Sequence, residues 1–167
     1  LAMALFANQR AYATDGAWNH ALQWLGVFTP HALAPIVGNL IADDGGFAIL
    51  RRGAVMAMLR YPRFRFRPSQ ADALHLDLWR DGDNLLRDAG SYSYNTEPEL
   101  LNYFGGTASH NTVQFDNRDQ MPRLSRFLFG DWLKTTFLEP ISTDATTTRF
   151  GTGYRDGKGV SHQRNLI

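Results

Sequence analysis

The sequence contains no cysteine, so it can form neither a disulfide framework nor a metal site built on thiolates. It has no uninterrupted apolar run of about 18 residues, the length that a membrane-spanning helix requires. A large excess of charge of one sign is also lacking, because 17 basic and 16 acidic side chains leave a formal net charge of +1. The composition therefore favours neither a membrane span nor a nucleic-acid partner.

Hydrophobic residues make up 44% of the 167 residues and aromatic residues 13%, which is enough for a folded core. This length fits one domain, or one domain plus the edge of another. Over residues 1–40 apolar side chains recur near helical spacing. After a turn signal at residues 43–46, short segments of alternating pattern are separated by Gly, Pro, Asn and Asp. The pattern predicts a few helices followed by a mainly β structure.

In the helical part, Asp15 is predicted to be the N-cap of a helix that carries Trp18, Leu22, Leu25 and Phe28. The first residues read like the middle of a helix and the last ones like an interrupted strand. Both ends indicate a piece of a longer protein.

A run of short strands is predicted after residue 45. A turn at residues 81–82 (Asp-Gly) should join two of them in a hairpin. Residues 89–109 have little periodicity and read as an irregular segment, and loops of that length are more often functional than idle. Serial strands with such turns are typical of an antiparallel sandwich. The predicted strands cover residues 46–52, 54–61, 72–79, 84–88, 112–116, 131–138, 147–154 and 160–167.

A series of short motifs extends over residues 71–116. The motifs are Ala-Asp-Ala-Leu-His-Leu-Asp-Leu-Trp (71–79), Asp-Gly (81–82), Leu-Leu (85–86), Asp-Ala-Gly (88–90), Tyr-Ser-Tyr-Asn (92–95), Asn-Tyr-Phe (102–104), Thr107, Ser-His-Asn-Thr-Val (109–113) and Asp116. In register, they resemble the signature of the heparinase II/III-like C-terminal domain. Because they extend over some 50 residues, the resemblance is more specific than a single short motif.

The resemblance implies a bacterial protein with an α/α toroid followed by an antiparallel β-sandwich domain, and an acidic polysaccharide bound between them. Residues 1–42 would be the last toroid helices, and residues 43–167 a truncated β-domain. The implied reaction is β-elimination at a uronic acid: a base removes the C5 proton, the carboxylate charge is neutralised, and an acid protonates the leaving oxygen. Since most catalytic groups of such lyases lie on the toroid, this piece alone should be inactive. The resemblance also implies a periplasmic or secreted location.

One departure from the family pattern concerns a His-x-His that precedes the Ala-Asp-Ala of many relatives. Its first histidine takes part in catalysis and its second binds a structural zinc, but Pro68 and Gln70 stand at these positions here. Proline cannot transfer a proton. The alternative to a lyase is therefore a catalytically degenerate carbohydrate-binding or architectural module.

The two other zinc positions of the family are present, as Asp88 and His110. A carboxylate and an imidazole are suitable zinc ligands, and Gln70 with water could complete the set. Alternatively, Asp88 accepts backbone hydrogen bonds in a turn and His110 is a hydrogen-bonded core histidine.

Two residues are candidates for catalysis. His75, with Asp77 on the same predicted strand face, could replace the missing imidazole if that face lines the cleft; the alternative is a solvated sheet face. Tyr103 fills a tyrosine position of the family pattern, but the neighbouring arginine positions hold Leu101 and Gly105. A packing role is the alternative for Tyr103.

Candidates for substrate binding are Arg63, Arg65 and Arg67, which alternate at strand spacing. If they face the cleft, they could bind carboxylates or sulfates of an acidic polysaccharide, and otherwise they decorate a surface strand. Tyr92 and Tyr94, in the irregular segment, could stack on sugar rings or act as acid and base, and the alternative for both is a packing role.

Overall fold

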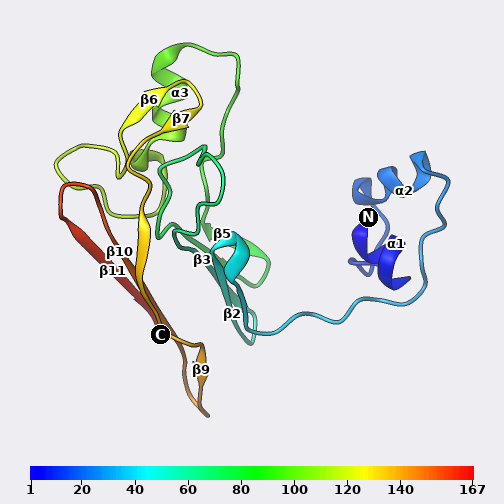
Figure 1. The fold of residues 1–167 in the computed structure, drawn as a ribbon. Helices are drawn as coiled ribbons and strands as arrows, with labels where there is room; N and C mark the ends of the chain where they lie inside the picture. Colours follow the sequence, from blue (N-terminus) through cyan, green and yellow to red (C-terminus); the bar gives the residue numbers. More distant parts are fainter. The chain divides into compact units, whose positions relative to one another are not determined.

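The computed structural model describes residues 1–167, which divide into two compact units, Leu1–Val37 and Gly38–Ile167 (Figure 1). No helix in it combines the length and the apolar character needed to cross a membrane.

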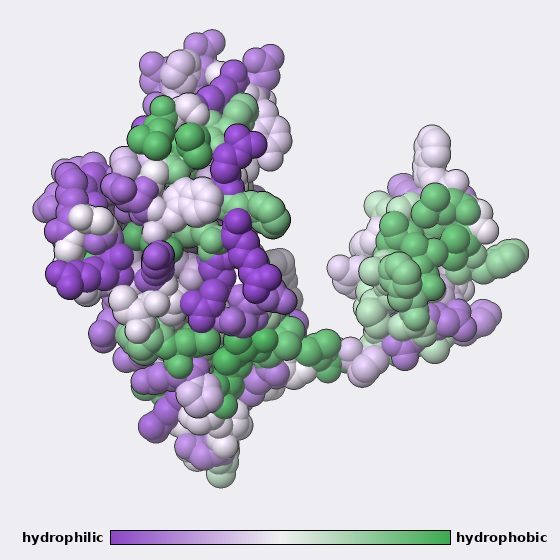
Figure 2. Space-filling model, in the orientation of Figure 1, coloured by the Kyte–Doolittle hydropathy of each residue, from purple (hydrophilic) through white to green (hydrophobic).

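The first unit is built from short helical turns and buries little apolar surface. Figure 2 shows hydrophobic residues gathered on the face of this unit that is in view. Leu22 is its buried hydrophobic residue, whereas Trp18, Leu25 and Phe28 are exposed. Its elements are α1 (Ala2–Ala7), η1 (Ala17–Asn19) and α2 (His20–Trp24).

The predicted N-cap at Asp15 is wrong. The carboxylate of Asp15 accepts a hydrogen bond from the Asn19 side chain at 2.7 Å, and the residue that precedes η1 is Gly16. The side chain of Asp15 therefore closes a local turn with another side chain and satisfies no backbone N–H of a helix.

The second unit begins with a five-stranded antiparallel sheet in sequential order. Asp81 and Gly82 join β4 to β5 with positive φ angles of 51° and 91°, which confirms the predicted hairpin turn. The strands are β1 (Leu40–Ala42), β2 (Phe47–Arg52), β3 (Val55–Arg60), β4 (Leu76–Arg80) and β5 (Asp83–Leu86), with η2 (Asp43–Gly45) between the first two.

A second antiparallel sheet has the order β11-β10-β8, with β9 paired to β10, and β6 and β7 form a separate hairpin (Figure 1). The strands are β6 (Arg123–Ser125), β7 (Leu128–Phe129), β8 (Lys134–Leu138), β9 (Ser142–Thr143), β10 (Thr148–Arg155) and β11 (Ser161–Leu166).

One hydrophobic core is shared by the two larger sheets. Leu59 from β3 and Phe150 and Tyr154 from β10 belong to the same buried cluster. Tyr61, which follows β3, lies with its ring 6.1 Å from that of Phe150. The prediction of a mainly antiparallel β structure with few helices is therefore confirmed.

Two predicted strands differ from the structure. The strand predicted over 72–79 begins only at Leu76, because Leu74 takes a positive φ of 58° that no strand residue adopts. The segment 112–116 forms no strand, and its only ladder contact is an isolated bridge between Phe115 and Arg118. An alternating pattern of apolar and polar side chains does not by itself give the backbone a neighbouring strand to pair with.

The segment predicted to be irregular, 89–109, contains the longest helix of the protein, α3 (Pro98–Gly105), followed by η3 (Thr107–Ser109). Pro98 stands in the first turn of α3, where a missing N–H costs nothing. The helix has only two turns, too short for its apolar spacing to stand out in the sequence.

Candidate functional site

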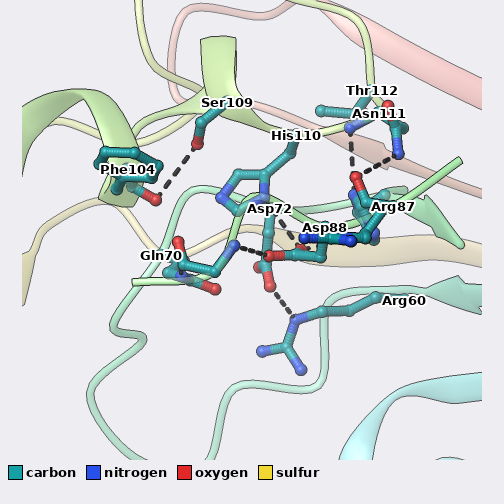
Figure 3. Close-up of polar contacts among 12 residues, drawn as sticks. Arg60, Gln70, Asp72, Arg87, Asp88, Phe104, Ser109, His110, Asn111 and Thr112 are labelled. Carbon is teal, nitrogen blue, oxygen red and sulfur yellow. Dashed lines mark hydrogen bonds and ion pairs between the residues drawn. The ribbon is translucent and has the colours of Figure 1, made fainter. Parts of the chain in front are cut away.

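Two histidines converge on one carboxylate in the second unit. His75 directly precedes β4, Asp88 lies two residues after β5, and His110 directly follows η3. The Oδ2 atom of Asp88 lies 3.2 Å from Nδ1 of His110 and 3.4 Å from Nε2 of His75. Figure 3 shows Asp88 and His110 facing each other. Three residues from different segments of the chain thus meet in one polar cluster.

Burial shapes the electrostatics of this cluster. Both histidines are buried and Asp88 is partly exposed. The hydrogen bond from His110, with a second from the Gly90 backbone N–H, lowers the pKa of Asp88 to about 2. Burial lowers the pKa of His75, against the opposing charge of Asp88. Asp88 is therefore a carboxylate and His75 a neutral imidazole near pH 7.

The three side chains could hold a metal ion. One ligand atom from each lies within 4.8 Å of the other two. Zinc bonds of about 2.0–2.1 Å to nitrogen and oxygen place tetrahedral ligand atoms about 3.3 Å apart. The 3.2 Å and 3.4 Å separations around Asp88 are close to that spacing. Two imidazoles and a carboxylate are also a donor set that zinc prefers.

The backbone of Asn111 opposes ligation by His75. Its N–H donates to Nδ1 of His75 at 3.1 Å, so the proton of the neutral ring belongs on Nε2, the atom nearest Asp88. A metal at Nε2 would move that proton to Nδ1 and break the bond from Asn111. Metal-bound histidines more commonly donate through their second nitrogen. The cluster therefore fits zinc in donor type and in the spacing around Asp88, with one hydrogen bond lost on binding.

Gln70, the third predicted ligand, makes other contacts. Its amide nitrogen donates to the carbonyl oxygen of Gly90 and lies 3.3 Å from Oγ of Ser91. These bonds tie Gln70 to the turn that follows Asp88. Its ligation of a metal stays a prediction.

His75 and Asp77 do not form a solvated face. Only 4% of His75 and 8% of Asp77 are exposed, so the expectation of a solvated alternative is wrong. The alternation inferred for a strand over 72–79 fails at His75, which lies before β4. The catalytic role of His75 stays a prediction, and the contact that the structure gives it is with Asp88.

Arg63, Arg65 and Arg67 do not lie on a strand, which corrects the expectation from their alternation. The chain from residue 61 to residue 75 forms neither helix nor strand. Pro62 and Pro68 flank the three arginines and lack the N–H that a sheet ladder uses.

Two of these arginines already have anionic partners. Nε of Arg63 lies 2.8 Å from the carboxylate of Asp43, and Arg65 pairs with Asp44. Both acids belong to η2. Ion pairs within the protein thus neutralise two of the three predicted substrate-binding cations. The role of the three arginines in substrate binding stays a prediction.

The predicted tyrosines are exposed, and two of them contact Phe104 of α3. Tyr103 lies on α3, 53% exposed, with its ring edge-on to Phe104 at 5.2 Å. Tyr92 stacks on the same Phe104 at 5.3 Å, and Tyr94 contacts Phe127 edge-on at 5.9 Å. The structure therefore brings Tyr92 and Tyr103 to one aromatic ring, that of Phe104.

Two residues that sequence reasoning missed, Arg123 and Arg126, line a small cavity near these tyrosines together with Tyr94 and Phe127. They lie in and after β6, in a hairpin that was not predicted. The spacing of the two arginines carries no periodic signal, so nothing in the sequence distinguished them from surface charges.

The family model described as "Heparinase II/III-like, C-terminal" matches residues 41–167. The chain belongs to this family. The match includes every member of the histidine cluster and both missed arginines. No curated protein matches the chain.

Solved structures of family enzymes share the fold. A heparan sulfate lyase (HepC) mutant from Pedobacter heparinus is 21% identical with a TM-score of 0.61, over 88% of this chain. A heparinase III gene product is 23% identical with a TM-score of 0.60, also over 88%. Another heparinase III is 18% identical with a TM-score of 0.55, over 82%. This chain spans only 22% of the length of each.

Proposed function

We propose that this chain is part of a polysaccharide lyase that cleaves an acidic, uronate-containing polysaccharide by β-elimination. The observation that carries the proposal is the family match over residues 41–167, supported by the fold shared with a heparan sulfate lyase. Because the chain spans 22% of that enzyme, catalysis is assigned to the whole protein and not to these residues alone. An acidic polysaccharide, a toroid domain in residues 1–42 and a periplasmic or secreted location belong to the same proposal.

Among the residues of this chain, Tyr103 is the candidate for proton transfer. Its side chain is about half exposed on α3, so its hydroxyl can reach a bound sugar. His75 is buried, and in this proposal it positions Asp88.

We also propose that the histidine cluster binds zinc with a structural role. The ligands would be His75, Asp88 and His110. In the alternative set, Gln70 takes the place of His75. A bound ion would hold together the chain before β4, the chain after β5 and the chain after η3, which adds to the stability of the fold.

A catalytically degenerate carbohydrate-binding module is the second candidate. Pro68 cannot transfer a proton, and Gln70 is hydrogen-bonded to the turn after Asp88. His75, the possible substitute, is buried. These observations favour a protein that binds the glycan without cleaving it.

An assay for the unsaturated product, followed by ultraviolet absorbance, separates the two functions. The full-length protein is tested on several polyuronates, beside a Tyr103→Phe variant and a matched Tyr12→Phe control, whose tyrosine is 56% exposed. A lyase gives product, and loss of the Tyr103 hydroxyl lowers kcat at least about a hundredfold, as expected for a general acid or base. Binding without product from any polyuronate supports the degenerate module.

Zinc is tested by metal analysis of the purified protein and by thermal unfolding with and without a chelator. We expect about one zinc ion per chain and a lower unfolding temperature after chelation. His75→Ala and Gln70→Ala distinguish the two ligand sets, because only the substitution that removes a true ligand should release the metal. Asp88→Asn should weaken binding in either case. A metal-free protein that chelator does not affect would contradict the zinc proposal.

A further inference from the structure

Asn111 bonds two other segments of the chain through its side chain. Its amide nitrogen donates to two backbone carbonyl oxygens, that of Leu76 at 3.2 Å and that of Arg87 at 3.1 Å. Figure 3 shows the bond to Arg87. An amide nitrogen carries two hydrogens, so both side-chain donors of Asn111 are in use.

Each segment at this junction carries one member of the histidine cluster. The two carbonyls belong to the residue after His75 and to the residue before Asp88. Asn111 itself directly follows His110. One side chain therefore sets how far apart the three segments lie, and with that the spacing of the cluster.

The junction lies beyond the end of the β4–β5 ladder. The last paired residues on that side are Leu78 and Leu86. Past them, both polar groups of the Leu76 backbone bond Asn111. The N–H donates to the Asn111 carbonyl oxygen at 3.2 Å, and the carbonyl oxygen accepts the amide bond. Asn111 thus takes the place of a strand neighbour and satisfies backbone groups that the ladder leaves open.

Arg164 on β11 holds this junction from the second sheet. Its Nη1 donates to the carbonyl oxygens of Asn111 and Leu74, each at 2.7 Å. Leu74 directly precedes His75 and has the positive φ of 58°. The guanidinium is partly buried and forms no ion pair. Hydrogen bonds from a charged donor contribute more than those between neutral groups, so Arg164 fixes both carbonyls firmly.

We propose that Asn111, held by Arg164, is a positioning residue that preorganises the histidine cluster for zinc. This inference rests on the proposed zinc site, whose ligands it holds in place. A site whose segments are already ordered loses less freedom when an ion binds, and therefore binds it more tightly. Asp88 and His110 are common to both candidate ligand sets and lie next to the junction, so the role does not depend on the third ligand.

Asn111→Leu tests the junction in the full-length protein. The change keeps a side chain of similar size and removes both amide donors. The backbone N–H that donates to His75 is still present, so its opposition to ligation by His75 is retained. Asn165→Leu, at an exposed position of β11 next to Arg164, is the matched control.

Arg164→Met and Arg164→Lys test the contribution of the guanidinium. Methionine keeps an apolar side chain and lacks the donor. One nitrogen of Arg164 makes both bonds, so the single ammonium group of a lysine can replace it. This pair of variants decides the question if Asn111→Leu does not fold.

Zinc affinity is measured on each folded, metal-free protein by competition with a chromophoric chelator, and stability by urea unfolding. We expect Asn111→Leu and Arg164→Met to weaken zinc binding about ten- to a hundredfold, as for other residues that orient metal ligands. Arg164→Lys should recover most of that loss, and Asn165→Leu should bind zinc like the unaltered protein. A purely structural role would lower the stability of the metal-free protein and leave its zinc dissociation constant unchanged.

The outcomes separate this inference from the zinc proposal. If the unaltered protein binds zinc and Asn111→Leu or Arg164→Met binds it equally well, the positioning role is overturned while the zinc site stands. If Arg164→Lys binds zinc no better than Arg164→Met, the two carbonyl bonds do not set the affinity, and the role of Arg164 is overturned. An unaltered protein that binds no zinc overturns the zinc proposal, and this inference with it.

Discussion

Two groups of arginines in this protein differ in what surrounds their charge. Arg63 and Arg65 stand out in the sequence by their alternation, and the carboxylates of Asp43 and Asp44 pair with them. Arg123 does not stand out, yet its charge meets a carbonyl oxygen and an aromatic ring, with no carboxylate in ion-pair contact. Arginines that are prominent in a sequence are not necessarily those whose charge lacks an anionic partner.

The comparison has a physical basis. A charge already paired within the protein must give up that partner, or share it, before it binds a ligand. A guanidinium whose covered N–H donors lack any partner carries an uncompensated desolvation cost. The four predictions below test this difference, in order of decreasing effect.

The largest effect is expected at a third arginine, whose carboxylate partner is buried. Nε of Arg60 lies 2.7 Å from Asp72; the side chains of the two residues are 25% and 9% exposed. Asp72→Asn should lower the free energy of unfolding by about 2 kcal/mol, because it leaves a partly enclosed cation without its anion. Urea unfolding measures the change. A loss as small as that at an exposed pair would show that enclosure does not govern these arginines.

Removing the charge of Arg123 should have the opposite sign. Arg123→Met keeps a flexible apolar side chain against Phe129 and removes a cation without an anionic partner. We expect the free energy of unfolding to rise by about 1 kcal/mol. Urea unfolding beside Arg63→Met, which should not stabilise, provides the control. A clear loss of stability in Arg123→Met would mean that the charge is already compensated within the protein.

Acid should release Arg63 from its partner. Hydrogen bonds from Arg63 and Tyr61 lower the pKa of Asp43 below its ordinary value of 3.8. A lowered folded-state pKa means that the stabilisation is present above about pH 4 and is lost as the pH falls through the lowered value. The Arg63 Nε–H resonance should therefore move in an acid titration below pH 4. In Asp43→Asn this transition should be absent, and its persistence would assign it to another group.

The smallest effect is expected at the most exposed pair. The side chains of Arg65 and Asp44 are 66% and 88% exposed. Solvent and salt screen such a pair, so Asp44→Asn should leave the unfolding temperature unchanged within error. Scanning calorimetry at low and high salt measures it. A marked destabilisation would show that this pair does more than neutralise a surface charge.

Much of the sheet structure could be predicted from the sequence. Segments of alternating pattern marked β2, β3, β10 and β11, and the Asp-Gly pair marked the β4–β5 turn, because these signals arise from neighbouring residues. The two-turn helix α3 and the hairpin of β6 and β7 were missed because short elements have no distinctive period.

The site could be predicted in part. Asp88 and His110 were identified through their motifs, and the structure brings them within 3.2 Å of each other. That His75 joins them could not be foreseen, because it depends on the positive φ of Leu74 and on the path of the chain before β4. The enclosure of Arg123 depends on Gly105 and Phe129, which approach it only in the folded chain.

The sequence by itself determined the family, the antiparallel strands with their turn, and the replacement of two family histidines by Pro68 and Gln70. These features depend on local patterns and on residue identity. Only the tertiary structure decided which charges are paired, which histidine joins Asp88, and that two buried donors of Arg123 have no hydrogen-bond partner. Each of those depends on residues distant in the chain meeting in space, and the availability of a charged group is set by all of its neighbours.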